Sequence, residues 1–458
     1  MEEYSPAIKK AVIISATLSS FLTPFMASSI NIALPTIGKE FGMSAIYLSW
    51  VASTYLLTAA MFLVPLGKAA DIYGRKKIFL LGLIIYTSSA IFCAASYSGF
   101  MIIIGRIIQG IGGAMIFGTG VSLVTSVVPT NERGKIIGIT ISMVYVGLSL
   151  GPFLGGVLTH NFGWRSVFIF NVPLGSIAIY YVMFKLKGEW AEAKGEKLDY
   201  SGSLIYGLSL VMLMYGLSQL PKTYGFILLG GGLIGLLIFI FWELRIENPV
   251  LNINLFRNNT VFAFSNLAAL INYSATFAIT FLLSFYLQYI KLLTPQAAGS
   301  ILVTQPIVMA IFAPISGRLS DKIESRIIAS IGMGLTVIGL IMLTLLTENS
   351  GTYYIVLCLI ILGLGFGLFS SPNTNAVMSS VERKYYGIAS ATVSTMRLIG
   401  QMLSMGIAML VMAILIGNVQ IKPEYHSQLI ASMKIIFTIF VVLCTIGIFA
   451  SLARGKHL

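Results

Sequence analysis

The feature that most constrains this chain is a series of long apolar stretches that follow one another along its whole length. Each stretch has about 20 residues or more, the length at which a helix crosses the hydrocarbon core of a bilayer. Only 10% of the 458 residues are charged and 57% are hydrophobic, whereas soluble domains carry roughly 25% charged residues. The sequence therefore predicts an all-α membrane protein.

Fourteen such stretches are present, and an even number places both ends of the chain on the same side of the membrane. The first follows Lys9 and Lys10 and is too long for the apolar part of a cleaved signal peptide, so we expect it to be retained. The predicted helices span residues 11–37, 45–66, 78–97, 101–128, 135–160, 166–186, 200–219, 225–244, 261–289, 297–317, 326–346, 353–378, 386–416 and 428–453.

The basic residues predict which side the two ends occupy, because cytoplasmic segments of membrane proteins are enriched in Lys and Arg. With both termini in the cytoplasm, 21 of the 29 Lys and Arg residues lie on the cytoplasmic side and five lie outside. Arg106, Arg397 and Lys434 fall within helices. Attraction to the anionic inner leaflet explains the net charge of +13. We therefore expect a multi-pass protein of the inner cell membrane, with no nucleic-acid partner.

One internal repeat is visible. Residues 67–71 read Gly-Lys-Ala-Ala-Asp, and a similar Gly-Arg-Leu-Ser-Asp segment ends at Asp321. Each follows a predicted helix at a cytoplasmic turn, and duplicated halves of this kind occur in transporters. We predict a six-helix bundle over 1–190, two inserted helices over 191–256 and a second six-helix bundle over 257–458.

The first copy of the repeat continues to residue 77 as a longer motif. Gly67 and Gly74 permit a tight turn between two helices. Asp71 can accept hydrogen bonds from Arg75 and from a helix N-terminus. A basic loop that only held the chain to the lipid surface would need neither the acid nor the two glycines.

Glycines in the predicted 135–160 helix allow two interpretations. Three of them lie four residues apart and share a face on which another backbone can approach closely, and a proline removes one helical hydrogen bond. General small-residue packing would explain this spacing, but it would not require the Gly-Pro-x-x-Gly-Gly ending. The residues of the pattern are Gly138, Gly147, Gly151, Pro152, Gly155 and Gly156.

Arg106 begins a further motif, Arg-Ile-Ile-Gln-Gly-Ile-Gly-Gly-Ala, in the predicted 101–128 helix, and Gln109 belongs to it. A charge within a membrane helix is costly and usually indicates function. An arginine near a helix end can instead extend its charged head to the lipid headgroups. The sequence leaves both interpretations open.

Together these motifs resemble those of the major facilitator superfamily, in its fourteen-helix drug/proton antiporter branch, over essentially the whole chain. The resemblance implies two bundles that move around a central site. It implies that the Gly67 to Asp71 segment latches the halves when the cytoplasmic side is closed, and that the glycine pattern marks an exporter. It also implies that Arg106 contacts the first helix and serves proton coupling.

One position departs from the family pattern. Aligned on Asn31 and Pro35, this chain has Met26 where that pattern has an aspartate that is a candidate for proton handling. None of the 16 acidic residues falls in the middle of the membrane in this topology, whereas Arg106 and Arg397 lie inside predicted helices. Because arginine does not lose its proton, coupling through a rim acid such as Asp71, coupling through the charge of the substrate, and uniport all remain open. We expect lipophilic neutral or anionic substrates in preference to dications.

Uncharged polar and flexible residues in the predicted helices are candidates for the substrate cavity. Polar side chains in hydrocarbon usually face the bundle interior, although each alone is also explained by hydrogen bonds between helices. The candidates are Met26, Asn31, Tyr145, Asn266, Asn272, Tyr273, Gln305, Asn373, Asn375 and Gln401.

The sequence shows no cluster of His, Cys or acidic residues, so we predict no catalytic centre, no metal site and no cofactor. The expected partners are membrane lipid and a small-molecule substrate, with protons left open, and we expect a monomer. The expected function is an alternating-access transporter that exports amphipathic drugs or metabolites. The alternative is a metabolite or organic-anion transporter of the same fold.

Overall fold

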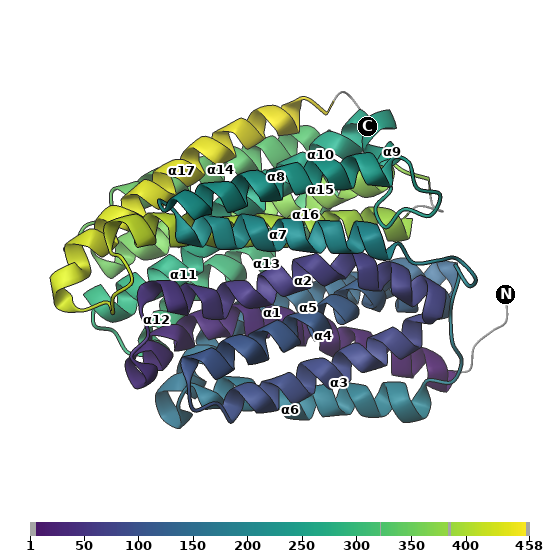
Figure 1. Ribbon diagram of the computed structural model, residues 1–458, viewed down its shortest axis with the longest axis horizontal. Helices are drawn as coiled ribbons and strands as arrows, with labels where there is room; N and C mark the ends of the chain where they lie inside the picture. Colours follow the sequence, from purple (N-terminus) through teal and green to yellow (C-terminus); the bar gives the residue numbers. More distant parts are fainter. Residues whose placement is uncertain (1–5, 321, 383–385, 455–458) are drawn as a thin grey trace.

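The computed structural model describes residues 6–320, 322–382 and 386–454, and within these ranges the chain is helical without any strand. Fourteen spans in this part of the chain are long and apolar enough to cross a membrane. They run along the long axis of the molecule (Figure 1). The chain enters the first span and leaves the last at one end, here called the terminal end. The opposite end, which holds the turn at residues 42–44, is called the far end.

Two six-helix bundles, one above the other in Figure 1, and an inserted pair of helices make up the molecule. The first bundle contains α1 (Pro6–Phe41), α2 (Ala45–Tyr73), α3 (Arg75–Ala94), α4 (Gly99–Val127), α5 (Thr130–Phe162) and α6 (Arg165–Tyr180), which the π-helical turn η1 (Tyr181–Lys185) continues. The inserted pair is α7 (Tyr200–Gln219) and α8 (Thr223–Glu243), and the short α9 (Asn254–Asn258) follows it.

The second bundle also has six spans, several of them divided. They are α10 (Thr260–Thr276) with α11 (Ala278–Phe285) and η2 (Tyr286–Ile290), α12 (Pro295–Leu302) with α13 (Thr304–Leu319), α14 (Ser325–Thr344), α15 (Thr352–Ser379), α16 (Tyr386–Leu415), and η4 (Pro423–Tyr425) with α17 (His426–Leu452).

The order of helix contacts in the first bundle is repeated in the second, as expected for duplicated halves. The pairs α1–α5, α2–α4, α3–α4 and α3–α6 correspond to α10–α16, α13–α15, α14–α15 and α14–α17. The bundles meet where α2 packs on α16 and where α5 packs on α12 and α13. The predicted division at 1–190, 191–256 and 257–458 stays a prediction.

The ninth span is divided, although the sequence pattern predicts one helix over 261–289. Phe277 separates α10 from α11. Ser404 on α16 accepts a hydrogen bond of 3.0 Å from the backbone N–H of Ala278, so the interrupted backbone keeps a partner inside the protein, as a membrane segment must. The partner comes from another helix, which is why the local pattern predicts no break.

The tenth span is also divided, in place of the single helix predicted over 297–317. Val303 separates α12 from α13. Pro306 follows three residues later and has no N–H to bond to the carbonyl group of Leu302, which accounts for the break.

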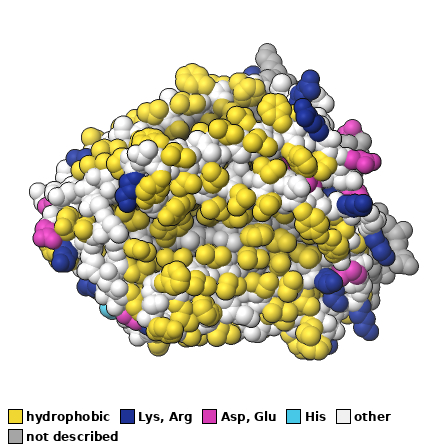
Figure 2. Space-filling model, viewed as in Figure 1, with side chains coloured by type: hydrophobic (Ala, Val, Ile, Leu, Met, Phe, Trp, Pro, Cys, Tyr) yellow, Lys and Arg dark blue, Asp and Glu magenta, His cyan; other side chains and the backbone are white. Residues whose placement is uncertain are grey.

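The surface matches a lipid environment. Hydrophobic side chains cover most of the middle of the face in Figure 2, and charged side chains gather at its two ends. The inserted α8 is the span least covered by protein, with 17% of its apolar window buried. It packs on α7, which in turn contacts α2 and α16 and so touches both bundles.

The glycine face of α5 lies against α1, as the four-residue spacing predicts. A Cβ atom added at Gly147 would lie 2.6 Å from the carbonyl oxygen of Phe21, and one at Gly155 would lie 2.7 Å from Cβ of Ser29. At Gly151 the added atom would overlap the side chain of Ser28. The two backbones are therefore as close as the absence of side chains permits.

We predict that Gly151→Leu disrupts the α1–α5 contact and abolishes transport, because the new side chain has no space. Gly138→Leu is the matched control, since nothing lies within 4 Å of a Cβ added at Gly138. Leucine also has the higher helix propensity, by about 1 kcal/mol, so Gly138→Leu is expected to keep the thermal stability of the purified protein. Equal stability and activity of the two variants would contradict the close-packing assignment.

Candidate transport site and gating motifs

The Gly67 to Asp71 segment belongs to a helix and not to a loop. The prediction that the second helix ends at 66 is wrong, because α2 continues to Tyr73 and Gly74 alone makes the turn into α3. Gly74 has φ +118°, in the region that favours glycine. Asp71 near the end of α2 and Arg75 at the start of α3 therefore meet at this turn, and Arg75 Nε donates to Asp71 Oδ1 at 2.8 Å, which confirms the expected pairing.

Arg75 also binds the segment between the first bundle and α7, a contact that the sequence did not predict. Its guanidinium donates to both carboxylate oxygens of Glu192, at 2.7 and 2.8 Å, and to Ser126 at 2.7 Å. Glu189 accepts from the backbone N–H groups of Lys76 and Lys77 at the start of α3, where the helix dipole favours an anion.

A third glutamate of the same segment completes the contact. Glu196 forms an ion pair with Lys68 on α2, and the backbone N–H of Ala193 donates to the carbonyl oxygen of Asp71. Residues 189–196, here called the acidic linker, therefore lie across the α2–α3 turn. In this structure Asp71 and Arg75 bind the acidic linker, whereas the family resemblance implies a latch to the other half.

Arg106 lies inside the first bundle with 1% of its surface exposed, so it does not extend to the headgroups. Its Nε donates to the carbonyl oxygen of Val51 at 3.1 Å, and its Nη1 donates to Gln109 Oε1 at 2.5 Å. The guanidinium lies 4.5 Å from the centre of the Tyr55 ring, a cation–π distance. Its recorded partners thus lie on α2 and α4 and not on the first helix that the resemblance implies.

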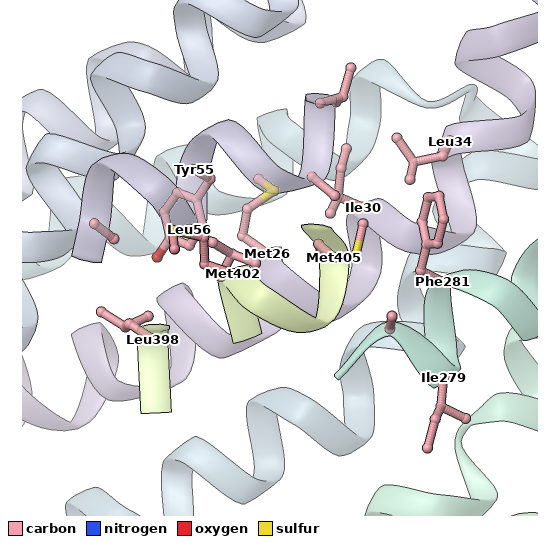
Figure 3. Packing of buried hydrophobic residues seen from close by; sticks show 14 of the residues in the cluster. Met26, Ile30, Leu34, Tyr55, Leu56, Ile279, Phe281, Leu398, Met402 and Met405 are labelled. Carbon is pink, nitrogen blue, oxygen red and sulfur yellow. The ribbon is translucent and has the colours of Figure 1, made fainter. Parts of the chain in front are cut away.

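Met26 lies in an apolar contact between the bundles. It is fully buried and belongs to one apolar cluster with Tyr55 of α2 and with Met402 and Met405 of α16. Figure 3 shows these side chains close together near Ile30. At the position where the family pattern has an aspartate, this chain therefore has an adaptable apolar contact.

Tyr145 and Tyr273 come together halfway along the molecule, where the bundles meet. The hydroxyl groups of Tyr145 on α5 and Ser370 on α15 are 3.2 Å apart. The Tyr273 ring packs edge-on against Phe366, with 5.3 Å between ring centres. Tyr145 packs against the same small apolar cluster, here called the central cluster, which also contains Met309 and Met396.

Arg397 brings a positive charge to the central cluster. Its guanidinium lies 5.1 Å from the centre of the Tyr273 ring, and its Nε is buried without a hydrogen-bond partner. Gly400 lies three residues further along α16. A Cβ atom added there would lie 2.6 Å from the carbonyl oxygen of Leu270. This close approach holds α16 and the Arg397 side chain against α10.

The remaining candidates are spread over three regions. Asn266, Asn272 and Asn373 are buried in the second bundle, each with an amide oxygen that has no partner, and Asn272 lacks one for its nitrogen as well. Asn31 lies towards the far end. Asn375 is exposed and donates to Ser320, which places it at the terminal end and away from the central cluster. Gln305 and Gln401 are half-buried.

Asp321 lies outside the residues that the structure describes, so its predicted role stays a prediction.

Pro152 and Gly156 of α5 face the second bundle. A Cβ atom added at Gly156 would lie 2.5 Å from the carbonyl oxygen of Pro295, and one at Gly299 would meet the carbonyl oxygen of Pro152. Within the described ranges, no group of three metal-ligating side chains could hold an ion.

Hydrogen bonds join the bundles at the far end. Ser44 Oγ lies 2.5 Å from Asn418 Oδ1, and the backbone N–H of Ala45 donates to Val419 at 3.2 Å. Closer to the middle, Ser284 donates to the carbonyl oxygen of Asn31, and Gln288 donates to that of Ile32. The far end is therefore closed in this structure.

Fourteen spans, duplicated bundles and these motifs agree with the family comparison. A family model described as the Major Facilitator Superfamily matches residues 16–405 and, in a second match, 265–456. The chain belongs to the major facilitator superfamily. Its family and its relatives are transporters, and the chain is a multi-pass membrane protein that works by alternating access.

The curated relatives transport different compounds. The chain is 31% identical, over 85% of both sequences, to the riboflavin transporter RibZ of Clostridioides difficile. It is 28% identical to the multidrug resistance protein Stp of Mycobacterium tuberculosis, over 85% of this chain and 73% of that protein. It is 27% identical to the methylenomycin A resistance protein of Bacillus subtilis, over 89% and 88%. Multidrug relatives agree with the fourteen-helix efflux branch.

Solved transporter structures share the fold at low sequence identity. A bacterial homologue of the human lysosomal transporter Spinster, in an inward-facing and unoccupied conformation, aligns with a TM-score of 0.69 at 17% identity, over 98% of both chains. The peptide transporter POT aligns with a TM-score of 0.71 at 15% identity, over 97% of this chain and 94% of that one.

We predict that charge removal releases the acidic linker from the α2–α3 turn. In a Glu192→Gln, Glu196→Gln double variant, two ion pairs are lost, and trypsin is expected to cleave at Lys194 and Lys197 several-fold faster than in the unaltered protein. Glu424→Gln, at an exposed far-end position, is the control. Surface ion pairs contribute about 1 kcal/mol or less each, which is why the expected increase in cleavage rate is only several-fold. Unchanged cleavage would show that other contacts hold the linker.

Proposed function

We propose that this transporter exports lipophilic neutral or anionic organic compounds, and that it binds them at the central cluster between the bundles. The observation that carries the proposal is the Arg397 guanidinium beside the Tyr273 ring, with its Nε buried and without a hydrogen-bond partner. A cavity that selects dications would need a carboxylate there. The ion pairs recorded among the described residues involve neither Arg106 nor Arg397.

The chemistry of the central cluster suits flat ring systems. Tyr145, Tyr273 and Phe366 offer aromatic faces and edges, and Met309 and Met396 can adjust to ligands of different shape. Polar groups without partners give orientation to a ligand in an otherwise apolar site. The resemblance to a riboflavin transporter supports a planar, uncharged or anionic substrate. The resemblance to multidrug resistance proteins supports a broad range of substrates.

The direction of transport follows from the proposed orientation. The excess of basic residues at the terminal end favours a cytoplasmic location for both termini. In this orientation the closed far end is the outer end. Relatives named for drug resistance and the glycine pattern of α5 favour export from the cytoplasm. A flavin-type metabolite is the second candidate substrate, because the riboflavin transporter is at least as similar to this chain as the resistance proteins are.

We predict that Arg397→Gln lowers the transport of an anionic dye by roughly tenfold, because a charge-assisted hydrogen bond contributes about 1.5–3 kcal/mol. Transport of neutral riboflavin is expected to change by about twofold or less. The measurement is counterflow in liposomes that contain the purified protein. Lys434→Gln, which removes a helix cation outside the central cluster, is the matched control and should leave both substrates unaffected.

A dicationic dye provides the opposite test. We expect it to be transported least of the three compounds by the unaltered protein. A dicationic dye that is bound more tightly than the anionic one, or equal loss of all three activities in Arg397→Gln, would contradict the proposed substrate class.

A further inference from the structure

The inserted helices bury two carboxyl groups at the terminal end. Asp199 precedes α7 and Glu243 is the last residue of α8, and the antiparallel pairing of these helices brings them together. Their exposed fractions are 6% and 3%. Carboxylates are seldom buried to this degree without a cation, and among the described residues neither group takes part in a recorded ion pair.

The two side chains face each other across Gly202. A Cβ atom added at Gly202 would meet Asp199 Oδ2 and would lie 2.7 Å from Glu243 Oε1. The facing oxygens of the two carboxyl groups therefore border the same small space. Glycine at position 202 is therefore the residue that leaves room for this contact.

Three of the four carboxyl oxygens accept hydrogen bonds from N–H groups. Asp199 Oδ1 accepts from the backbone of Gly202 and Oδ2 from Trp242 Nε1, both at 2.9 Å. Glu243 Oε2 accepts from the backbone of Leu251 at 2.7 Å. The fourth oxygen, Glu243 Oε1, is buried and has no hydrogen-bond partner. A proton on one of the two facing carboxyls would supply the missing donor.

Among the described residues, no cation is recorded beside the pair, and the buried Arg454 after α17 is not among the groups that act on Glu243. The ionisable group whose charge acts on Glu243 is Asp199, which is also acidic. Lys68 is paired with Glu196 and Arg397 lies over Tyr273. The other ionisable groups at this end on the elements around the pair are Asp71 and Tyr73 on α2, Lys197 before α7, Tyr200 and Tyr206 on α7, and the exposed Arg245 and Glu247 after α8.

We propose that Asp199 and Glu243 form a proton-binding site in which the two carboxyl groups share one proton. Two carboxylates in contact resist simultaneous ionisation, so one keeps a proton that hydrogen-bonds to the other. A metal ion fits less well, because the Trp242 and Leu251 N–H groups point at the oxygens that would have to coordinate it. The proton is exchanged with water at the terminal end.

The site connects three parts of the protein. Asp199 begins the helix that touches both bundles, Glu243 ends α8, and Leu251 belongs to the segment that leads into the second bundle. Release of the proton leaves two buried negative charges in contact, and this repulsion separates the helix ends. The protonated pair is therefore the docked state, and raising the pH weakens the docking. This inference does not depend on the proposed substrate.

The test is infrared difference spectroscopy of the full-length protein in lipid nanodiscs during a pH titration. We expect the unaltered protein to show the C=O stretch of a buried protonated carboxyl, which disappears as the pH is raised. Glu243→Gln and Asp199→Asn are each expected to lose this signal. Glu247→Gln, an exposed glutamate four residues further on, is the control and should retain it. Sodium, potassium or magnesium salts should leave the signal unchanged.

Thermal unfolding of the same proteins gives a second readout. The side-chain amide that Glu243→Gln introduces can donate to Asp199 at every pH, so the unfolding temperature of this variant should vary less with pH than that of the unaltered protein. If Asp199→Asn does not fold, the Glu243→Gln comparison alone decides. The same carboxyl signal in the unaltered protein and Glu243→Gln, its loss in Glu247→Gln, or its displacement by a metal cation would overturn the proposal.

Discussion

The structure depends on close contact between helix backbones. Lipid offers apolar helices no hydrophobic reason to associate, so packing and hydrogen bonds must hold a membrane bundle together. Here Gly147, Gly151 and Gly155 bring α5 against α1, and Gly156 brings the same helix against the start of α12 in the other bundle. The helix α5 therefore packs on α1 within the first bundle through Gly155, and it contacts the second bundle through the next residue, Gly156.

The proposed substrate site and the proposed proton site occupy different places in the molecule. Halfway along the molecule the ionisable side chains are Tyr145, Tyr273 and Arg397, and the position of the family's aspartate holds the fully buried Met26. The buried carboxyl pair lies in the inserted helices instead. We therefore propose that any coupling to protons acts through the docking of α7 and α8 on the bundles, and not through competition with substrate in the central cluster.

Local patterns predicted much of this arrangement, and tertiary contacts determined the rest. Apolar run length was enough for fourteen spans, and the spacing from Asp71 to Arg75 was enough for their ion pair. The break at Phe277 could not be predicted, because Ser404, which accepts from the backbone N–H of Ala278, lies on a distant helix. The acidic linker has no periodic pattern that would reveal its fold. The Asp199–Glu243 pair did carry a signal: a short connection between two predicted helices places the start of one beside the end of the other.

The most direct test of the account is a disulfide bond across the closed far end. The three native cysteines are buried, so a Ser44→Cys, Asn418→Cys variant can be oxidised selectively, and the present side chains are in hydrogen-bond contact. If the bundles must separate there during each cycle, oxidation should abolish transport in liposomes and a reductant should restore it. Each single cysteine variant should be insensitive to oxidation. Full transport with the disulfide formed would contradict alternating access through this end.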